Sequence, residues 1–182
     1  MPAQAPDALA SALRGSWSAA PGKKAEAYID KFFNTTRLGD QISGQVEGNH
    51  GVYTVTIRLE DGRLSSACSC YIGKGGGCHH CAALAHTFLR RPEPFTLVEK
   101  KERAAVATLD DLSAYLRSRP LVELLAELRA KGITQKAFCE AIGMNPRHLS
   151  TVRSSEERNH FYNELGAIKL AVLWALENLE TE

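Results

Sequence analysis

The sequence has no long hydrophobic run, and this lack excludes a helix that crosses a membrane. No stretch approaches the roughly 18 uninterrupted apolar residues that such a helix needs. The alanine-rich start also lacks the basic region and the apolar core of a signal peptide. We therefore expect a cytoplasmic protein that has no membrane partner.

The sequence also lacks an excess of charge of either sign, with 22 lysine and arginine residues against 21 aspartate and glutamate residues. Residues 1–91 carry 10 basic and 7 acidic side chains, and residues 92–182 carry 12 and 14. Neither half is the strongly basic block that indicates nucleic-acid binding from charge alone. Any inference of DNA binding must therefore rest on local motifs.

Aromatic residues are few, at 7%, but hydrophobic residues make up 44% of the 182 residues. This composition is typical of a globular protein with one or two small domains. Cysteine is scarce and unevenly placed: four of the five cysteines fall within 14 residues, at positions 68, 70, 78 and 81. Disulfide frameworks space their cysteines along the chain, so in a reducing compartment this cluster indicates a metal site. Cys139 lies apart on an apolar helical face and is expected in the core.

The first half predicts a small antiparallel sheet flanked by helices. Residues 1–22 are rich in alanine, serine and proline and lack a convincing helix cap, so we expect a mobile or loosely docked arm. Apolar residues at helical spacing predict an amphipathic helix, with Ala25, Tyr28, Ile29, Phe32 and Phe33 on one face. Alternating patterns then predict three strands, which begin near residues 42, 52 and 64, and a tight hairpin turn at residues 61–62. A helix over residues 78–91 completes a domain of residues 23–91.

The second half predicts helices only, so the fold class is α+β. Residues 92–107 resemble a charged linker, and residues 108–182 a helical domain of about five helices. Thr108 and Asp111 have the spacing of a capping box, and Pro120 suits the first turn of a helix that Gly132 ends. The last segment, about residues 163–179, has too wide an apolar face for a lone surface helix. We expect it to pack in a core or against a second copy of the chain, as a homodimer.

The run CSCYIGKGGGCHHC, from residue 68, has the spacing of a tetrahedral zinc site. Residues two apart on a strand point to the same face, so Cys68 and Cys70 can direct their sulfurs to one point. Four glycines between residues 73 and 77 allow the chain to turn back sharply. Residues two apart on a helix diverge, so we expect Cys78 at the helix cap and His80 in the first turn. Three sulfurs and one imidazole nitrogen would complete one structural Zn²⁺ site, which would supply much of the folding free energy of so small a sheet.

Two neighbours are alternative ligands. Cys81 could replace His80 and give four thiolates, and His79 could serve if the helix started later. Cys81 falls on the same apolar stripe as Leu84 and Phe88, where a free thiol behaves as a small hydrophobe. We therefore prefer His80 as the fourth ligand and expect His79 to face solvent.

A catalytic interpretation is weaker than a structural one. Four protein ligands leave no coordination position for a reactive water. A cysteine nucleophile with a histidine base is conceivable, but the ligand spacing explains both residue types at once. We expect that the protein is not an enzyme.

The order of elements around these ligands resembles the SWIM zinc finger, whose pattern is C-x-C, a variable loop and then C-x-H. The matching segments are residues 42–48, 53–57, 68–70 and 78–80, and the resemblance covers roughly residues 22–91. The resemblance implies a structural zinc ion and a binding role toward DNA or proteins, and it implies no catalytic activity. Two residues depart from the pattern of many members: Tyr71 stands in place of proline and His79 in place of lysine. These departures leave the ligands intact.

Residues 133–153 resemble a second motif, the repressor-type helix-turn-helix. Thr134 would cap the first helix, Gly143 would form the turn, Asn145 would cap the second helix, and Leu149 and Val152 would lie on its buried side. The side chains expected to face DNA are Gln135, Lys136, Asn145, Arg147, His148, Ser150, Thr151 and Arg153. Arg147 would read guanine and Asn145 adenine, whereas Gln135, Lys136 and Ser150 would contact phosphate or its neighbours.

We therefore expect a zinc-stabilised DNA-binding protein, regulatory or active in DNA maintenance, that uses the second helix and the SWIM-like unit. The alternative is an adaptor for protein partners, such as a recombination or helicase factor, in which the helices are only scaffold. Acidic residues at 140, 156 and 157 would weaken attraction to phosphate, whereas residues 145–153 contain none.

Overall fold

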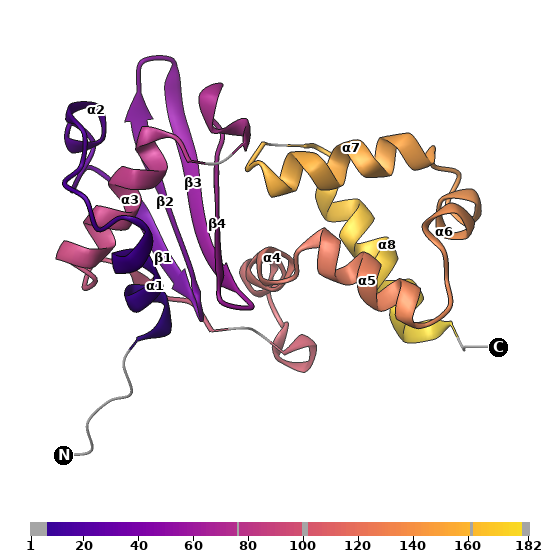
Figure 1. Ribbon diagram of the computed structural model, residues 1–182. Coiled ribbons are helices and arrows are strands. Elements are labelled where there is room, and N and C mark those ends of the chain that lie inside the picture. Colours follow the sequence, from indigo (N-terminus) through magenta and orange to yellow (C-terminus); the bar gives the residue numbers. More distant parts are fainter. Residues whose placement is uncertain (1–6, 76, 100–101, 161, 180–182) are drawn as a thin grey trace. The chain divides into compact units, whose positions relative to one another are not determined.

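The computed structural model describes residues 7–75, 77–99, 102–160 and 162–179. The chain divides into two units, residues 1–99, here called the sheet unit, and residues 100–182, the helical unit (Figure 1). The fold is α+β, as predicted: a mostly antiparallel five-stranded sheet is followed by a helical region.

The sheet has the strand order β4-β3-β2-β1-β5. Its strands are β1 (Phe33–Leu38), β2 (Gln41–Gly48), β3 (Gly51–Glu60), β4 (Arg63–Cys68) and β5 (Thr96–Leu97). Strands β1 to β4 are antiparallel to their neighbours, and β5 is parallel to β1. The three predicted strands are β2, β3 and β4, and the predicted turn between β3 and β4 has positive φ at Asp61 (48°) and Gly62 (75°), as its tightness requires.

The prediction of a helix over residues 25–33 is wrong beyond the first turn. Helix α2 covers only Lys23–Glu26, and the chain turns at Asp30, whose φ is 61°. Aspartate tolerates this left-handed conformation better than most residues, and the β-branched pair that follows, Thr35 and Thr36, favours a strand. Four of the five apolar residues still pack inward, with Ala25 and Ile29 against Ala83, whereas Phe33 is exposed.

The expected linker over residues 92–107 also needs correction. Thr96 and Leu97 pair with β1, and Phe95 is buried with its ring edge-to-face against Phe88, 5.0 Å between centroids. The Thr35 hydroxyl donates to the carbonyl oxygen of Pro94 at 2.8 Å. These contacts bind the segment to the sheet unit, which therefore extends to residue 99.

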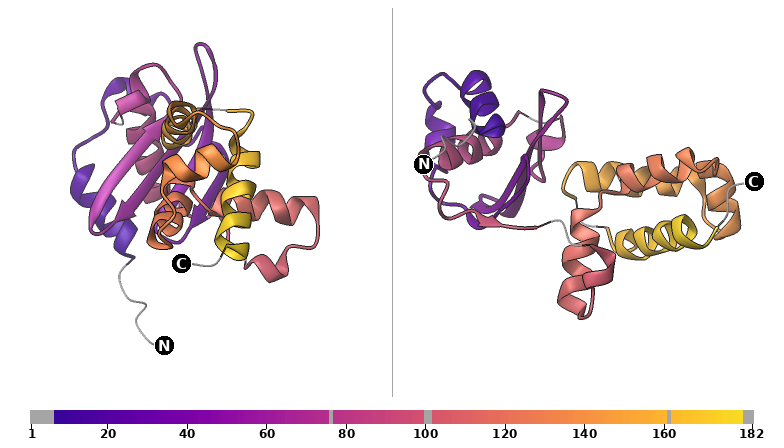
Figure 2. Two further views of the ribbon diagram at one scale, coloured as in Figure 1. Left: turned by 90° about the vertical axis from the view of Figure 1, so that its right-hand side faces the viewer. Right: turned by 90° about the horizontal axis from the view of Figure 1, so that it is seen from below.

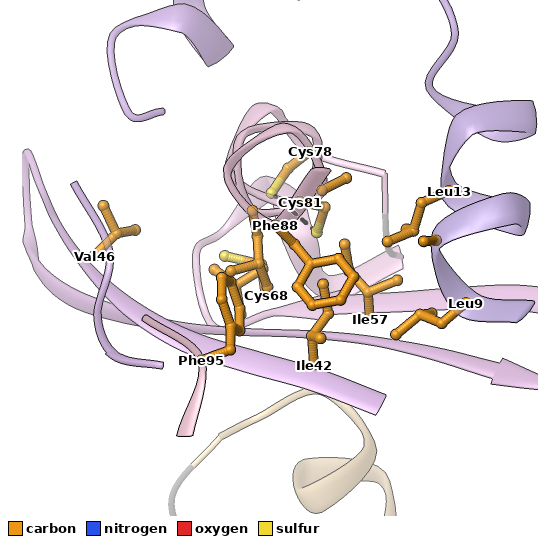
Figure 3. Close-up of a cluster of buried hydrophobic side chains, with 14 of the residues drawn as sticks. Leu9, Leu13, Ile42, Val46, Ile57, Cys68, Cys78, Cys81, Phe88 and Phe95 are labelled. Carbon is orange, nitrogen blue, oxygen red and sulfur yellow. Dashed lines mark hydrogen bonds between the residues drawn. The ribbon is translucent and has the colours of Figure 1, made fainter. Parts of the chain in front are cut away.

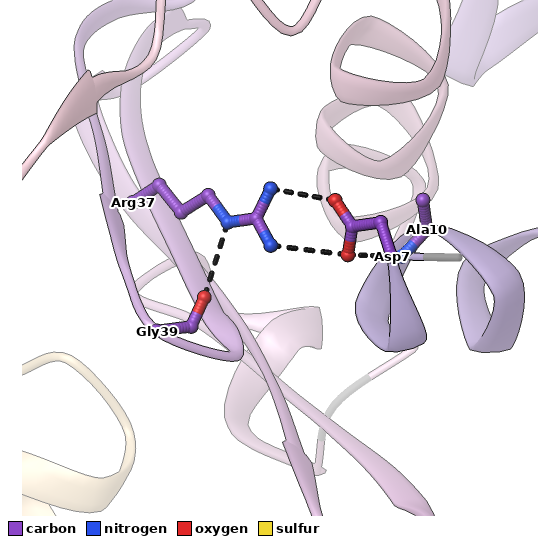
Figure 4. Close-up of polar contacts among 4 residues, drawn as sticks. All are labelled: Asp7, Ala10, Arg37 and Gly39. Carbon is purple, nitrogen blue, oxygen red and sulfur yellow. Dashed lines mark hydrogen bonds and ion pairs between the residues drawn. The ribbon is translucent and has the colours of Figure 1, made fainter. Parts of the chain in front are cut away.

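The arm expected over residues 1–22 is instead a docked helix where it is described; residues 1–6 lie outside the described residues. Helix α1 (Ala8–Ser16) is capped by Asp7, whose carboxylate accepts the backbone N–H of Ala10 at 3.2 Å. The same carboxylate binds both terminal nitrogens of Arg37 in β1, at 2.6 and 3.0 Å (Figure 4). Leu9 and Leu13 are fully buried in the sheet unit's core (Figure 3).

The core of the sheet unit lies between the sheet and two helices, α1 and α3 (His79–Arg90), which cover the same face (Figure 2). Ile42, Val46, Val55 and Ile57 contribute to it from β2 and β3. Gly44 lets α3 come close, because a Cβ there would lie 3.1 to 3.2 Å from Thr35, Leu84 and Phe32. This packing positions the first turn of α3 over the end of β4.

The helical unit contains α4 (Leu109–Ser118), α5 (Leu121–Ala130), α6 (Gln135–Ala141), α7 (Pro146–Glu157) and α8 (Leu165–Asn178). The predicted caps are confirmed: Thr108 and Asp111 form a capping box, and Thr134 and Asn145 accept N–H groups at the starts of α6 and α7. Gly132 and Gly143 have positive φ after α5 and α6. Among the described residues, none of the helices combines the length and the apolar character needed to cross a lipid bilayer.

Candidate metal centre

The structure brings together the four side chains predicted as metal ligands. Cys68 ends β4, Cys70 follows two residues later, Cys78 is the N-cap of α3, and His80 lies in the first turn of α3. One ligand atom from each residue lies within 4.8 Å of the other three, and all four side chains are buried. Figure 3 shows the sulfurs of Cys68 and Cys78 on the face of the sheet that α3 covers.

Cys70 reaches this cluster from a bend, whereas the sequence predicted a strand. The β3–β4 pairing continues one residue past the end of β4, since the Ser69 N–H donates to the Thr54 carbonyl oxygen at 3.0 Å. The chain then bends into the 3₁₀ turn η1 (Ile72–Gly75). The Cys70 N–H points to the Cys68 sulfur at 3.5 Å, and the Gly73 N–H points to the Cys70 sulfur at 3.1 Å. Such donors stabilise thiolates and orient them for a metal.

Gly73 is required by close approach rather than by a positive φ. A Cβ at this position would lie 2.5 Å from the Cys68 Cβ, 2.7 Å from the Cys68 carbonyl oxygen and 3.0 Å from the Cys70 sulfur. Gly77 serves the sharp turn itself, with a φ of 73°, and its N–H donates to the Ser66 hydroxyl. The glycine-rich loop therefore packs against the cluster as well as returning the chain to α3.

The His80 ring presents its Nδ1 to the sulfurs, 3.6 Å from Cys68 and 3.8 Å from Cys78. Its Nε2 is buried and has no hydrogen-bond partner among the described residues. The ring is held by Tyr28, Tyr53 and His79, with centroid distances of 4.6, 5.0 and 4.0 Å. Burial, and then the nearby His79, lower the pKa of His80, which favours the neutral imidazole that binds metal.

The pKa shifts of the clustered thiols differ in direction, and Cys78 is the thiol whose pKa is lowered. Hydrogen bonds from the Cys68 and Cys81 thiols hold the pKa of Cys78 far below its ordinary value. The same contact with Cys78, and then burial, raises the pKa of Cys68 and of Cys81. Cys78 also caps a helix N-terminus, where partial positive charge favours a thiolate.

The two alternative ligands lie outside the group of four. Cys81 is fully buried, and its sulfur is 3.7 Å from that of Cys78, but it packs in the apolar core beside Leu84 and Phe88. His79 is half-buried, with its ring against Tyr28, so the expectation that it faces solvent is only partly right. Neither residue belongs to the set whose ligand atoms all lie within 4.8 Å of one another.

The donor set and its spacing fit a tetrahedral ion. Metal–ligand distances of about 2.0 to 2.3 Å give ligand–ligand separations of about 3.5 Å in a tetrahedron. Two of the three nitrogen–sulfur separations at His80, those to Cys68 and Cys78, are 3.6 and 3.8 Å, and the Cys70 ligand atom lies within 4.8 Å. Three thiolates and one imidazole are soft and borderline ligands, a combination that suits Zn²⁺.

The residues predicted to face DNA lie on α6 and α7 or at their caps, and they differ in solvent exposure and in the hydrogen bonds that their side chains make. Lys136, Asn145, Arg147, Ser150 and Thr151 are exposed, whereas Gln135, His148 and Arg153 are half-buried. The Asn145 side chain is engaged as a cap, since its oxygen accepts the N–H of Arg147 at 2.8 Å. The Ser150 and Thr151 hydroxyls donate to carbonyl oxygens one turn earlier.

Two of these side chains also have partners of their own. The His148 ring packs edge-to-face against Tyr162, 5.5 Å between centroids. Arg153 lies 3.9 Å from the carboxylate of Glu157, one turn later on the same helix. Both are therefore less available to a ligand than Arg147.

Sequence reasoning missed a buried ionic network that engages Glu156. Lys169, buried within α8, binds the Glu156 carboxylate at 2.5 Å and the carbonyl oxygen of Leu116 at 2.7 Å. The other Glu156 oxygen accepts the N–H of Leu121, at the start of α5, at 2.7 Å. A lone lysine inside the apolar run of α8 was the available signal, because a buried charge requires a partner.

Comparisons of the chain with protein-family models, with curated proteins and with solved structures find no match. The interpretation of the metal cluster and of the α6–α7 pair therefore rests on residues and geometry alone.

Proposed function

We propose that this protein binds one structural zinc ion through its sheet unit and DNA through its helical unit. Cys68, Cys70, Cys78 and His80 would hold the ion, and the observation that carries this part is their buried convergence within 4.8 Å. Bound there, zinc would join the end of β4 to the start of α3 and supply no catalysis, because four protein ligands leave no position for a reactive water. The protein is thus proposed as a binding protein and not as an enzyme.

The SWIM-like assignment belongs to the same proposal. Its support is the order of β2, β3, β4 and α3, with C-x-C at the end of β4 and C-x-H at the start of α3. Strand β5 and helix α1 add to this unit on either side of the resembling segment.

The DNA-binding part rests on one face of α7. Arg147, Thr151 and Ser154 fall within about 60° of one another around the helix axis and span about 10 Å along it, and Arg158 is the C-cap at the end of the helix. The Arg147 guanidinium is exposed and has no ion-pair partner within the described part of the chain. A helix of this kind fits a major groove, where arginine makes two hydrogen bonds to guanine or to a phosphate.

The acidic residues that weighed against DNA binding are largely engaged. Glu156 turns inward to Lys169, and Glu157 lies beside Arg153. Glu140 lies 3.8 Å from Lys136, and both side chains are well exposed, so that pair is weak and easily exchanged for a phosphate. The first turns of α7 therefore present the exposed Arg147 with no acidic residue in the same turns.

Substitution of Arg147 tests this proposal. Arg147→Ala should weaken binding to a labelled random duplex at about 50 mM salt, and should reduce the slope of log K against log salt by about 1. Fluorescence anisotropy of the zinc-loaded protein measures both quantities.

The matched control is Arg129→Ala, which removes an exposed arginine from α5 in the same unit and should leave binding close to that of the parent protein. Equal losses of duplex affinity in the two variants would mean that net charge alone explains the effect. That result would contradict a role for α7.

The second candidate function is an adaptor for protein partners. Helix α8 buries Ile168 and Val172 but leaves Leu170 and Trp174, one turn apart, exposed. Such a pair suits a protein partner or a second copy of the chain, which would give the two half-sites that repressor-type proteins use. Absence of duplex binding at low salt would favour the adaptor over the DNA-binding protein.

A further inference from the structure

A recess of about 260 Å³ lies beside the metal centre. It forms where the β2–β3 turn, η1 and the start of α3 meet at one end of the sheet (Figure 1). Its wall consists mostly of rings, from Tyr28, His50, Tyr53, Tyr71 and His79. A cavity of about 150 Å³ is enough to hold benzene, so this recess has room for a planar system of one or two rings.

One side of the recess is rigid. The His80 ring forms part of it and is held by Tyr28, Tyr53 and His79, so the wall is continuous with the candidate metal centre. Gly48 leaves room for the Tyr53 ring, because a Cβ at that glycine would lie 2.3 Å from it. The recess is therefore formed before any ligand arrives, which lowers the entropy cost of binding.

The other side is open. Tyr71 is 85% exposed and Ile72 is 68% exposed, so two neighbouring large side chains at the mouth of the recess are accessible to a ligand. An exposed ring at the mouth of a ring-lined recess can close over a flat ligand by stacking.

The lining favours some ligand classes over others. No carboxylate is present among the described residues that line the recess, so a cation would be held by the ring faces alone. The same residues include no lysine or arginine, so a phosphate group alone would find no cationic partner. The Asn49 amide, together with the tyrosine hydroxyls, offers hydrogen-bond donors and acceptors. A neutral flat heterocycle with donors and acceptors on its edge matches this lining.

We propose that the recess binds one unpaired nucleobase of a single-stranded nucleic acid. The inference builds on the proposed nucleic-acid function, but it uses residues of the sheet unit only. The base would stack on Tyr71 and the inner rings, as bases stack on aromatic platforms in other single-strand binders. A paired base cannot enter, because its faces are covered by its neighbours in the duplex.

The surrounding charge adds little, so stacking must supply most of the affinity. Lys23, Lys24 and Lys31 flank Tyr28 along the chain and are exposed, but Glu26 and Asp30 are exposed in the same segment. We therefore expect binding that depends on the base more than on the phosphate backbone.

Fluorescence anisotropy of the full zinc-loaded chain tests this inference. The probes are a labelled oligodeoxythymidine of about 12 nucleotides and the same strand with abasic sugars in place of its central nucleotides. The abasic strand should bind at least about fivefold more weakly, the low end for one stacked base. Tyr71→Ala should weaken oligodeoxythymidine binding by a similar factor and remove the difference between the two strands, whereas Tyr71→Phe, which keeps the ring, should retain it.

Leu109→Ala is the control, because Leu109 is 84% exposed, like Tyr71, but lies in the helical unit. It should bind both strands as the parent protein does. Equal binding of the two strands by the parent protein, or an unchanged Tyr71→Ala, would overturn the inference.

Arg147→Ala separates this inference from the proposed duplex binding. It should keep the preference for the strand with bases, since it changes α7 alone. Loss of duplex binding with that preference intact supports both proposals, whereas absence of duplex binding by the parent protein with the preference present overturns only the role of α7.

Discussion

At the scale of single residues, Gly73 connects the glycine-rich loop to the metal cluster. Its Cα approaches Cys68 and Cys70 so closely that one added methyl group would lie within 3.0 Å of both residues. Its φ is not in the left-handed region, so alanine meets a steric obstacle there and not a backbone one. The effect of a substitution therefore reports on packing against the ligands.

We expect Gly73→Ala to displace the two cysteines and to release zinc at a lower concentration of a competing chromogenic chelator. The control is Gly15→Ala in α1, where an added Cβ meets nothing within 4 Å and alanine favours the helix by about 0.5 to 1 kcal/mol. Release of zinc by Gly73→Ala at the parent's chelator concentration would show that the close approach is unimportant.

The four candidate ligands were predictable from their spacing in the sequence. The residues that pack around them were not. The C-x-C and C-x-H spacings predicted that Cys68, Cys70, Cys78 and His80 would come together, although Cys70 reaches the group from a bend and not from the expected strand. The close packing of Gly73 depends on how η1 lies over β4, and the enclosure of His80 depends on Tyr28 and Tyr53, far away in sequence. No local sequence pattern predicts contacts between residues so far apart in the chain.

At the scale of elements, α1 is attached to the sheet through its cap. Asp7 both accepts the Ala10 N–H and binds Arg37 of β1. Burial raises the pKa of Asp7, but the Arg37 hydrogen bond and the backbone donors outweigh it, so the pKa lies below its ordinary value of 3.8. The contribution of the ionised form to stability is complete above that value and is lost as the pH falls through the lowered pKa. A stability measurement at neutral pH therefore includes the full contribution of the ionised Asp7.

Substitution of Asp7 separates the cap from the ion pair. At neutral pH, Asp7→Ala should lower the free energy of unfolding by about 1 kcal/mol, because it removes the cap and the partner of Arg37. Asp7→Asn should cost less, since asparagine caps helices well and only the charge is lost. Urea unfolding followed by circular dichroism measures the series. Equal stability of Asp7→Ala and the parent protein would show that α1 is held by Leu9 and Leu13 alone.

Elements with a clear period were predictable, and those without one were not. Strands β2 and β3 alternate over their length, and α4, α6 and α7 begin at recognisable caps. Strand β1 has no such alternation and begins with a bulge before Thr36, and β5 is two residues long and pairs with β1 in parallel. Parallel pairing requires a long crossover, so it leaves no local signal.

At the scale of the whole molecule, the two units differ in what fills their cores. The helical unit has an apolar core that includes Leu121, Leu124, Leu149 and Val172. The sheet unit has a core too, but three cysteines and one histidine occupy part of it, and these groups are costly to bury without a partner. A bound zinc ion would satisfy them and lock the sheet to α3.

Elemental analysis of the purified protein tests this central claim most directly. We expect one zinc ion per chain, much less in Cys70→Ser and in His80→Ala, and an unchanged amount in Cys81→Ala and in Cys139→Ala, whose thiols lie outside the group of four. A preparation without bound transition metal, or a Cys70→Ser variant with as much zinc as the parent protein, would contradict the account.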